Sequence, residues 1–256
     1  MKPVVVWDLP TRAFHWSLVA LLIVTWFSGE DEGWVFALHT FTGYALFLLV
    51  LFRLMWGVIG SRHSRFGDFV HPWPKVRSYV GQLLSFSPPR HVGHNPLGGW
   101  MILLMLATVL GVALTGMAAG APLGAPGILP AGVPRALAGI MEEIHEGLAN
   151  FLILLAVVHV IGVLTGWLFT GENLIRAMIT GDKQLDEAAA DDEPAPVGLW
   201  RAVPLFLILV LLGYYMLEHT DLRQGGERED SHRWRTPTVM QAADSSGERR
   251  VWTLTS

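Results

Sequence analysis

Residues 144–160 read IHEGLANFLILLAVVHV and place His145 and His159 fourteen residues apart, in a segment (roughly 141–169) that is otherwise almost wholly apolar. Along an α-helix, fourteen residues rise about 21 Å and return to within about 40° of the starting direction. Both imidazoles should therefore project from one side of a helix at two depths. Because a bilayer core is about 30 Å thick and disfavours polar side chains, this pattern favours two stacked haems as the reason for burying them.

The composition indicates an integral membrane protein. Hydrophobic residues make up 52% of the 256 residues and charged residues only 16%, and the mean hydropathy is +0.41, as is typical of chains with several membrane spans. The first apolar segment lacks a small-residue cleavage site after a charged leader, so we expect a retained span. The segments long enough to cross a bilayer are about 13–29, 35–59, 97–118, 143–169 and 198–217.

The chain contains no Cys. This excludes disulfides, iron–sulfur clusters and the covalent attachment of a c-type haem, so any haem would be held by axial ligands and packing. The sequence shows no nucleophile–base pair, phosphate-binding glycine loop or nucleotide fingerprint. Hydrolytic and group-transfer chemistry are therefore not supported.

The distribution of basic residues predicts the orientation. The loop 61–96 carries five basic residues against one acid, Asp68, and the positive-inside rule places it in the cytoplasm. The N-terminus should then also be cytoplasmic, and in a Gram-negative bacterium the membrane would be the inner one. This orientation gives a cytoplasmic acidic linker at 183–197, outer loops at 28–34 and around 119–140, and a periplasmic tail at 218–256.

The first span should begin near Thr11, because Asp8 or Thr11 can cap a helix and Pro10 suits its first turn. His15 then lies one turn inside that span. His39 likewise lies one turn inside the second span, but at the opposite membrane surface.

Depth arranges the four histidines as two pairs. His39 and His145 lie about one turn below the outer surface. His15 lies about 21 Å below that surface, and His159 lies about 21 Å below His145. Each pair comes from two helices, as bis-imidazole ligation of a haem requires. A lone buried His would ordinarily be a hydrogen-bonded core residue, and zinc would need its ligands on one tetrahedron. We therefore predict an all-α integral membrane protein, with a four-helix transmembrane bundle binding two haems plus a fifth transmembrane helix.

Two arginines and one further histidine are candidates near the inner haem. Because haem propionates are anions that need compensation, we expect Arg12 or Arg53 to pair with one of them; a snorkelling Arg that reaches lipid headgroups is the alternative. His94, at the cytoplasmic mouth of the third span, would suit a helix cap, a proton carrier or part of a quinone pocket. The glycines of that span fit either close helix packing or room for a macrocycle.

Several motifs together resemble the bacterial cytochrome b561 family, which includes the b-type cytochrome subunits of membrane-bound nickel–iron hydrogenases. The resemblance covers roughly residues 5–182 and implies a four-helix bundle with two b haems that moves electrons between quinone and a second carrier. It also implies that the first and fourth spans ligate one haem, through His15 and His159, and the second and fourth the other, through His39 and His145. The motifs are FHW at 14–16, HTFTGY at 39–44, GHNPLG at 93–98, HEGLAN at 145–150 and ENLIRAMITG at 172–181.

The fifth span, 198–217, and the tail after it depart from the simplest members of that family. They favour a dedicated redox partner, and the opening VWDLPTR at 6–12 resembles b-type cytochromes that work beside periplasmic c-type cytochromes. The tail combines Arg residues with the isolated Trp234 and Trp252, so we expect it to dock a c-type cytochrome or a hydrogenase-like subunit near the outer haem. Two alternatives remain open: a haem-containing membrane anchor of a larger complex, and a stand-alone superoxide:quinone oxidoreductase.

Overall fold

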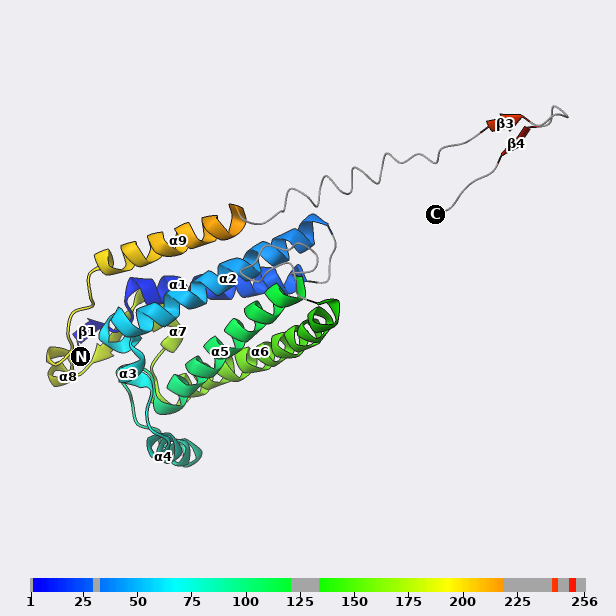
Figure 1. The fold of residues 1–256 in the computed structure, drawn as a ribbon. Helices are drawn as coiled ribbons and strands as arrows, with labels where there is room; N and C mark the ends of the chain where they lie inside the picture. The colour runs from blue at the N-terminus through cyan, green and yellow to red at the C-terminus, as the bar shows by residue number, and fades with distance from the viewer. Residues whose placement is uncertain (1, 30–32, 121–133, 219–240, 244–248, 252–256) are drawn as a thin grey trace.

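The computed structural model describes residues 2–29, 33–120, 134–218, 241–243 and 249–251. Long helices dominate it (Figure 1). In chain order they are α1 (Leu9–Phe27), α2 (Trp34–Ile59), α5 (Pro96–Gly120), α6 (Arg135–Thr170) and α9 (Ala202–Glu218). The sequence-based segments thus all correspond to helices.

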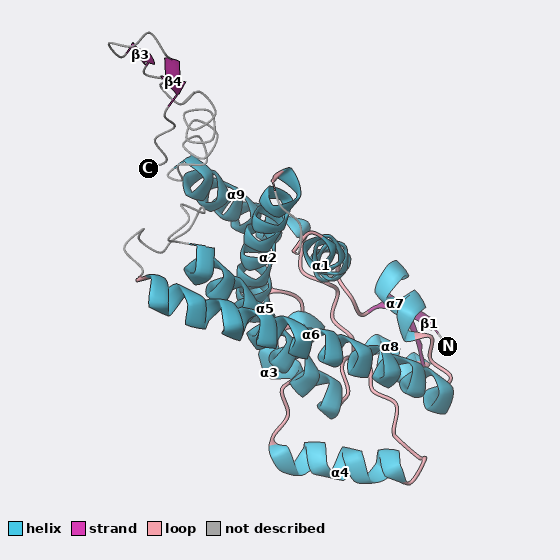
Figure 2. Ribbon diagram, turned by 90° about the vertical axis from the view of Figure 1, so that its right-hand side faces the viewer, coloured by secondary structure: helices cyan, strands magenta, loops and turns pink. Residues whose placement is uncertain are grey.

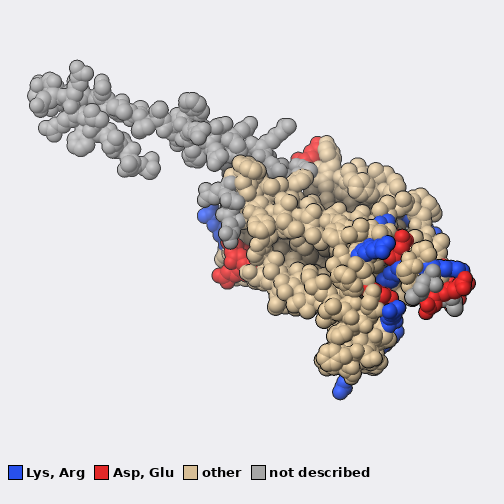
Figure 3. Space-filling view, turned by 180° about the vertical axis from the view of Figure 1, so that it is seen from behind, with Lys and Arg blue, Asp and Glu red and all other residues tan. Residues whose placement is uncertain are grey.

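Four helical segments in the described part of the chain are long and apolar enough to cross a membrane: Trp34–Ile59, Pro96–Gly120, Arg135–Thr170 and Leu199–Met216. The expected first span lies in α1, which is not among them because Arg12 and His15 lower its apolar character. Its role as a span stays a prediction. On the face seen in Figure 3, the charged side chains gather toward the two ends of the bundle and leave an uncharged belt between them.

The long helices pack as two hairpins and one peripheral helix. α5 pairs most extensively with α6, and α1 pairs with α2, while α2 also contacts α5. Helix α9 packs on the outer side of α2, where a Cβ on Gly213 would lie 2.9 Å from Leu48. The central core takes Phe14 from α1, Val50 from α2, Leu106 and Val109 from α5, and Leu152 from α6.

One end of the bundle is closed by short elements, which we call the base. There β1 (Lys2–Val5) pairs antiparallel with β2 (Asp182–Leu185), so the start of the chain lies beside the segment that follows α6 (Figure 1). The other short elements at this end are η1 (Arg62–Ser64), α3 (Phe66–Phe69), α4 (Trp73–Leu84), α7 (Leu174–Thr180), α8 (Glu187–Asp191) and η3 (Leu199–Arg201). The expected linker at 183–197 is therefore largely ordered onto the base.

The structure places a helix within one expected loop and shortens another. The loop 61–96 contains α4, which in Figure 1 is seen nearly end-on and in Figure 2 lies apart from the bundle. The outer loop does not reach residue 140, because α6 begins at Arg135 after the N-cap Pro134. His145 consequently lies ten residues into its helix, about 15 Å from the helix start. Its expected depth of one turn below the outer membrane surface stays a prediction.

Asp8 begins α1 and also ties it to the base. Its side chain accepts a hydrogen bond from the Thr11 amide at 2.9 Å, which confirms Asp8 and not Thr11 as the cap. The other carboxylate oxygen accepts from Trp56 Nε1 at 3.0 Å and Ser64 Oγ at 3.2 Å. Buried carboxylates of this kind are stable only when their oxygens are satisfied, so the position of α1 against α2 depends on this residue.

The tail is described only at β3 (Gln241–Ala243) and β4 (Arg249–Val251), which pair antiparallel. Trp234 and Trp252 lie outside the described residues. The expected docking role of the tail therefore stays a prediction.

Candidate functional site

His39 on α2 and His145 on α6 face each other across the bundle. Their ring centroids are 6.1 Å apart and the ring planes are inclined by 78°. Two imidazole nitrogens that each lie about 2 Å from one metal ion place their ring centroids about 6 Å apart. The pair is thus spaced as two axial ligands of a single metal would be.

Both rings of this pair are oriented by neighbouring helices. The Nδ1 of His39 lies 2.8 Å from the carbonyl oxygen of Thr25 on α1, and the Nδ1 of His145 lies 2.8 Å from that of Val112 on α5. A carbonyl can only accept, so each Nδ1 carries the proton and donates. Nε2 of each ring is then the unprotonated nitrogen, which is the arrangement of a metal-ligating histidine.

Two glycines give the rings room. A Cβ on Gly116 would lie 2.8 Å from Cε1 of His145, and one on Gly29 would lie 3.2 Å from Nδ1 of His39. Elsewhere on α5, a Cβ on Gly99 would overlap with the carbonyl oxygen of Phe69. The glycines of α5 thus serve close packing, and at Gly116 the packed group is a candidate ligand.

The inner pair, His15 on α1 and His159 on α6, is less closely joined. The two side chains are near enough to interact electrostatically. The His15 ring packs edge-on against Trp16 at 5.1 Å, and its Nδ1 is buried without a hydrogen-bond partner in the described part of the chain. The structure therefore brings these two histidines to the same region without fixing their rings as it fixes the outer pair.

An apolar layer separates the two pairs. Leu152 lies seven residues from each of His145 and His159 and is only 5% exposed. Phe14 and Val50 pack in the same cluster. The arrangement therefore has a layer of packed apolar side chains between two levels that each carry a pair of candidate histidines.

The donor set fits haem better than a protein-ligated metal ion. Among the described residues no three His, Cys, Asp or Glu side chains come together as a metal site. Two axial nitrogens from opposed helices suit an iron whose other four ligands come from a porphyrin. The buried Nδ1 of His15 has no hydrogen-bond partner among the described residues, which indicates that a polar group is missing beside the inner pair.

The two candidate arginines lie at the base. Arg53 is 2% exposed, donates to the Ser64 carbonyl at 3.0 Å and lies over the ring of Phe66. It therefore does not extend into the headgroup region as a snorkelling side chain would. Arg12 donates to the carbonyl oxygen of Ile179 at 2.6 Å, and its Nε is buried without a partner among the described residues.

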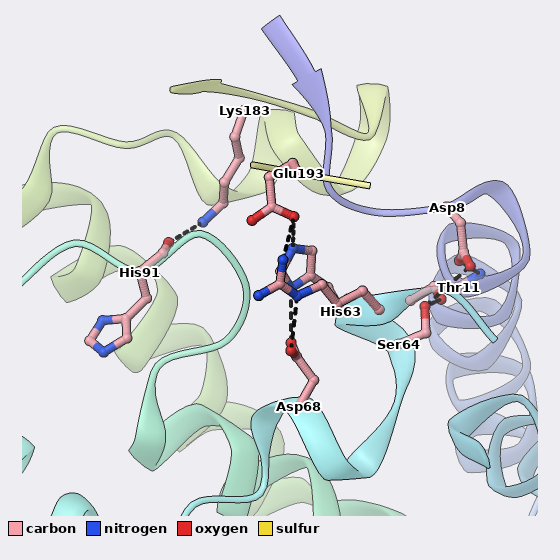
Figure 4. A network of polar contacts seen from close by, with 9 residues as sticks. Asp8, Thr11, His63, Ser64, Asp68, His91, Lys183 and Glu193 are labelled. Atoms are coloured by element: carbon pink, nitrogen blue, oxygen red, sulfur yellow. Dashed lines mark hydrogen bonds and ion pairs between the residues drawn. The ribbon is translucent and has the colours of Figure 1, made fainter. Parts of the chain in front are cut away.

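A polar network at the base was not foreseen from the sequence (Figure 4). His63 lies between two carboxylates, with Nδ1 2.9 Å from Asp68 and Nε2 2.9 Å from Glu193. Lys183 contacts Glu172 at 3.3 Å and the carbonyl of His91 at 3.0 Å. Burial lowers the pKa of Lys183, while Glu172 opposes that shift. His63 and Glu193 are 130 residues apart in the chain, and no local spacing links them.

His94 also lies at the base, between the rings of Trp7 at 4.4 Å and Phe69 at 4.8 Å. It is not the cap of α5, because the side chain of Asn95 accepts from the Gly98 amide at 2.7 Å. Burial, and after it the charge of Arg53, lowers the pKa of His94 well below its ordinary value. A neutral ring with one buried, unpartnered nitrogen is the result.

Comparison with known proteins gives a consistent picture. The model of the prokaryotic cytochrome b561 family matches residues 6–181. A probable Ni/Fe-hydrogenase B-type cytochrome subunit of Cupriavidus necator is 25% identical over 213 residues, which cover 71% of this chain and 87% of that protein. A protein of the same name from Azotobacter vinelandii is 31% identical over 121 residues, covering 37% of this chain and 50% of its own length.

In Escherichia coli K12, a probable Ni/Fe-hydrogenase 1 B-type cytochrome subunit is 27% identical over 140 residues, covering 43% of this chain and 59% of that protein. No solved structure matches the chain. The family match spans α1, α2, α5 and α6 and includes all four candidate histidines.

Proposed function

Because the chain belongs to the prokaryotic cytochrome b561 family, we propose that it conducts electrons across a membrane through two b haems, an outer one held by His39 and His145 and an inner one held by His15 and His159. Membership makes it a haem-binding, multi-pass b-type cytochrome of electron transport. The observation that best supports two-histidine ligation is the facing outer pair, with both Nδ1 atoms held by backbone carbonyls.

The protein's own contribution is to orient ligands and exclude water. When bound, each haem would supply one-electron redox chemistry. The carbonyls of Thr25 and Val112 keep Nε2 of each outer ligand unprotonated. The layer around Leu152 keeps water from the space between the two levels. A dry, apolar surround of this kind is one of the factors that set haem potentials.

The basic loop supports an orientation of the proposed path in the membrane. With the base in the cytoplasm and the opposite ends of α2 and α6 in the periplasm, the outer haem would serve a periplasmic partner and the inner haem the quinone pool of the bacterial inner membrane. The relatives are named as hydrogenase subunits, so a hydrogenase-like subunit or a c-type cytochrome is the partner we propose. α9 would carry the tail to the same side.

The haem assignment is tested by counting haem. The purified protein should give two haems per chain in a pyridine haemochrome assay. His145→Ala and His159→Ala should each remove one haem, the outer and the inner respectively, and leave part of the other. His71→Ala, which removes a base imidazole outside the bundle, is the matched control and should keep both. A wild-type protein with one haem per chain would overturn the assignment.

Quinol oxidation tests whether the protein conducts electrons. A quinol analogue should reduce both haems of the wild-type protein in detergent or in proteoliposomes. If both haems are present but neither quinol nor an isolated redox partner reduces them, the protein acts as a membrane anchor with structural haems.

A further inference from the structure

Four buried side-chain atoms lack a hydrogen-bond partner among the described residues: Arg12 Nε, His15 Nδ1, Tyr44 OH and His94 Nδ1. An unsatisfied buried polar group costs about 1–3 kcal/mol, and native proteins keep few of them. Three of the four belong to the inner level or the base, and only Tyr44 lies elsewhere. Such a local concentration requires a common explanation.

Packing fixes the His94 ring in place. Trp7 and Phe69 lie against it at centroid distances of 4.4 and 4.8 Å. The preceding Gly93 has no room for a side chain, because a Cβ there would lie 2.7 Å from Nδ1 of His63. The two neighbouring rings limit how far the His94 ring can turn to find another partner.

The surroundings of His94 are cationic. Two cations, Arg53 and Lys183, are near enough to act on it electrostatically, and no carboxylate is among the groups that do. The acids of the base are already engaged: Asp8 with Thr11, Trp56 and Ser64, Glu172 with Lys183, and Asp68 and Glu193 with His63. With its proton on Nδ1, the neutral ring is a donor whose cationic surroundings favour an anionic acceptor, and the described residues supply none.

Arg12 provides a second donor of the same kind. It lies one turn before His15 on α1, so its side chain and the candidate ligand share a face of that helix. Its Nη1 donates to Ile179, but its Nε has no partner in the described part of the chain. A Cβ on Gly181 would lie 3.1 Å from this Nε and 2.7 Å from the carbonyl oxygen of Trp7, and the Trp7 ring is the one that packs on His94.

We propose that His94 donates a hydrogen bond from Nδ1 to a propionate of the inner haem, beside the Nε of Arg12, and so acts as an anchoring residue for that haem. In this arrangement, one carboxylate would satisfy both orphaned donors. The inference rests on the proposed function only in requiring a haem between His15 and His159. It assigns His94 to cofactor binding and not to helix capping or a quinone pocket.

The test compares His94→Phe, which keeps an aromatic ring without a donor, with His94→Gln, which keeps an amide donor. In a redox titration followed optically, His94→Phe should lower the midpoint potential of the inner haem, because an unshielded propionate charge favours ferric iron. We expect the ferrous-to-ferric ratio at a fixed potential to fall roughly threefold, equivalent to about 30 mV for a one-electron couple. His94→Gln should fall between this variant and the wild type.

Haem release gives a second readout. The inner haem of His94→Phe should transfer to apomyoglobin faster than that of the wild type, while the outer haem is retained and reports that the bundle has folded. If Phe is not accommodated and both haems are lost, His94→Leu takes its place. His91→Phe is the matched control, because the Nδ1 of His91 already has a partner in Pro89, and it should change neither readout.

Two results would count against the inference in different ways. If His94→Phe and His94→Leu keep two haems with unchanged potentials and release rates, His94 has no contact with the propionate, and the two-haem function stands. If the wild-type protein binds haem only at His39 and His145, the proposed inner haem site is wrong, and so is this inference.

Discussion

The imidazole of His145 lies against the backbone of Gly116, so closely that a Cβ at that glycine would come within 2.8 Å of Cε1 and 2.9 Å of Nδ1 of the ring. The same ring donates to Val112 on the same helix, one turn earlier. α5 thus orients a candidate ligand carried by α6, although it contributes none of the four candidate histidines.

Gly116→Ala should consequently displace the His145 ring and impair the outer haem. We expect a lower occupancy or a shifted potential of the haem held by His39 and His145, with the inner haem retained. Separate optical titration of the two haems measures this. Gly147→Ala on α6, where a Cβ would meet nothing within 4 Å, is the matched control. Identical outer-haem properties in both variants would show that the ring has room to move.

How far the sequence predicts this fold can be judged from α6. The spacing of His145 and His159 within an apolar run predicts one helix that carries both residues, and α6 has this form. The depth argument predicts that His39 faces His145, and the ring separation agrees with that prediction. Periodicity succeeds here because a helix fixes the direction of every side chain along it.

The sequence does not predict the base. The pairing of β1 with β2 joins residues about 180 apart, and His63 meets Glu193 only because the segment after α6 folds back. The apolar run does not indicate the early start of α6, because residues 135–142 include Arg and Glu, which continue the helix beyond that run. Neither the contacts of the base nor the first turns of α6 follow a hydrophobic periodicity from which they could be predicted.

Asp8→Ala should destabilise the base. It removes the α1 cap and the acceptor of Trp56 and Ser64, and it leaves the buried Arg53 without its electrostatic partner. We expect a loss of roughly 3 kcal/mol, by analogy with breaking a buried ion pair, measured as a lower midpoint of thermal unfolding in detergent. Asp8→Asn, which keeps acceptor oxygen for the cap, should lose less. Equal midpoints for the wild type and Asp8→Ala would contradict the structural role assigned to this residue.

Truncation after Leu217 tests the proposed role of the tail. If Trp234 and Trp252 dock a periplasmic partner, the truncated protein should keep both haem spectra but lose co-purification with that partner or transfer electrons to it more slowly. Full-length protein with Trp234→Ala and Trp252→Ala is the matched variant and should show the same defect. If the truncated protein keeps its partner and its rate, docking by the tail is wrong.

Acidification should destabilise the loop that joins α4 to α5. Burial, and after it the positive charges of Lys75, His71 and Lys183, lowers the pKa of His91 below its ordinary value of 6.5, although the hydrogen bond with Pro89 opposes the shift. Between the ordinary and the lowered pKa, the unfolded chain binds a proton that the folded protein does not. Stability contributed by neutral His91 is therefore complete above about pH 6.5 and is lost as the pH falls toward the lowered value.

The midpoint of thermal unfolding should thus fall as the pH is lowered from 7.5 to 5.5, and His91→Gln should reduce this fall by roughly 2 °C. Gln retains an amide donor for the carbonyl of Pro89, so the variant removes the titration while keeping the contact. Arg90→Gln is the control, because arginine does not titrate in this range, and its pH dependence should equal that of the wild type. If His91→Gln and the wild type show the same pH dependence, the protons are taken up elsewhere, and His71, whose pKa is also lowered by burial, is the next residue to replace.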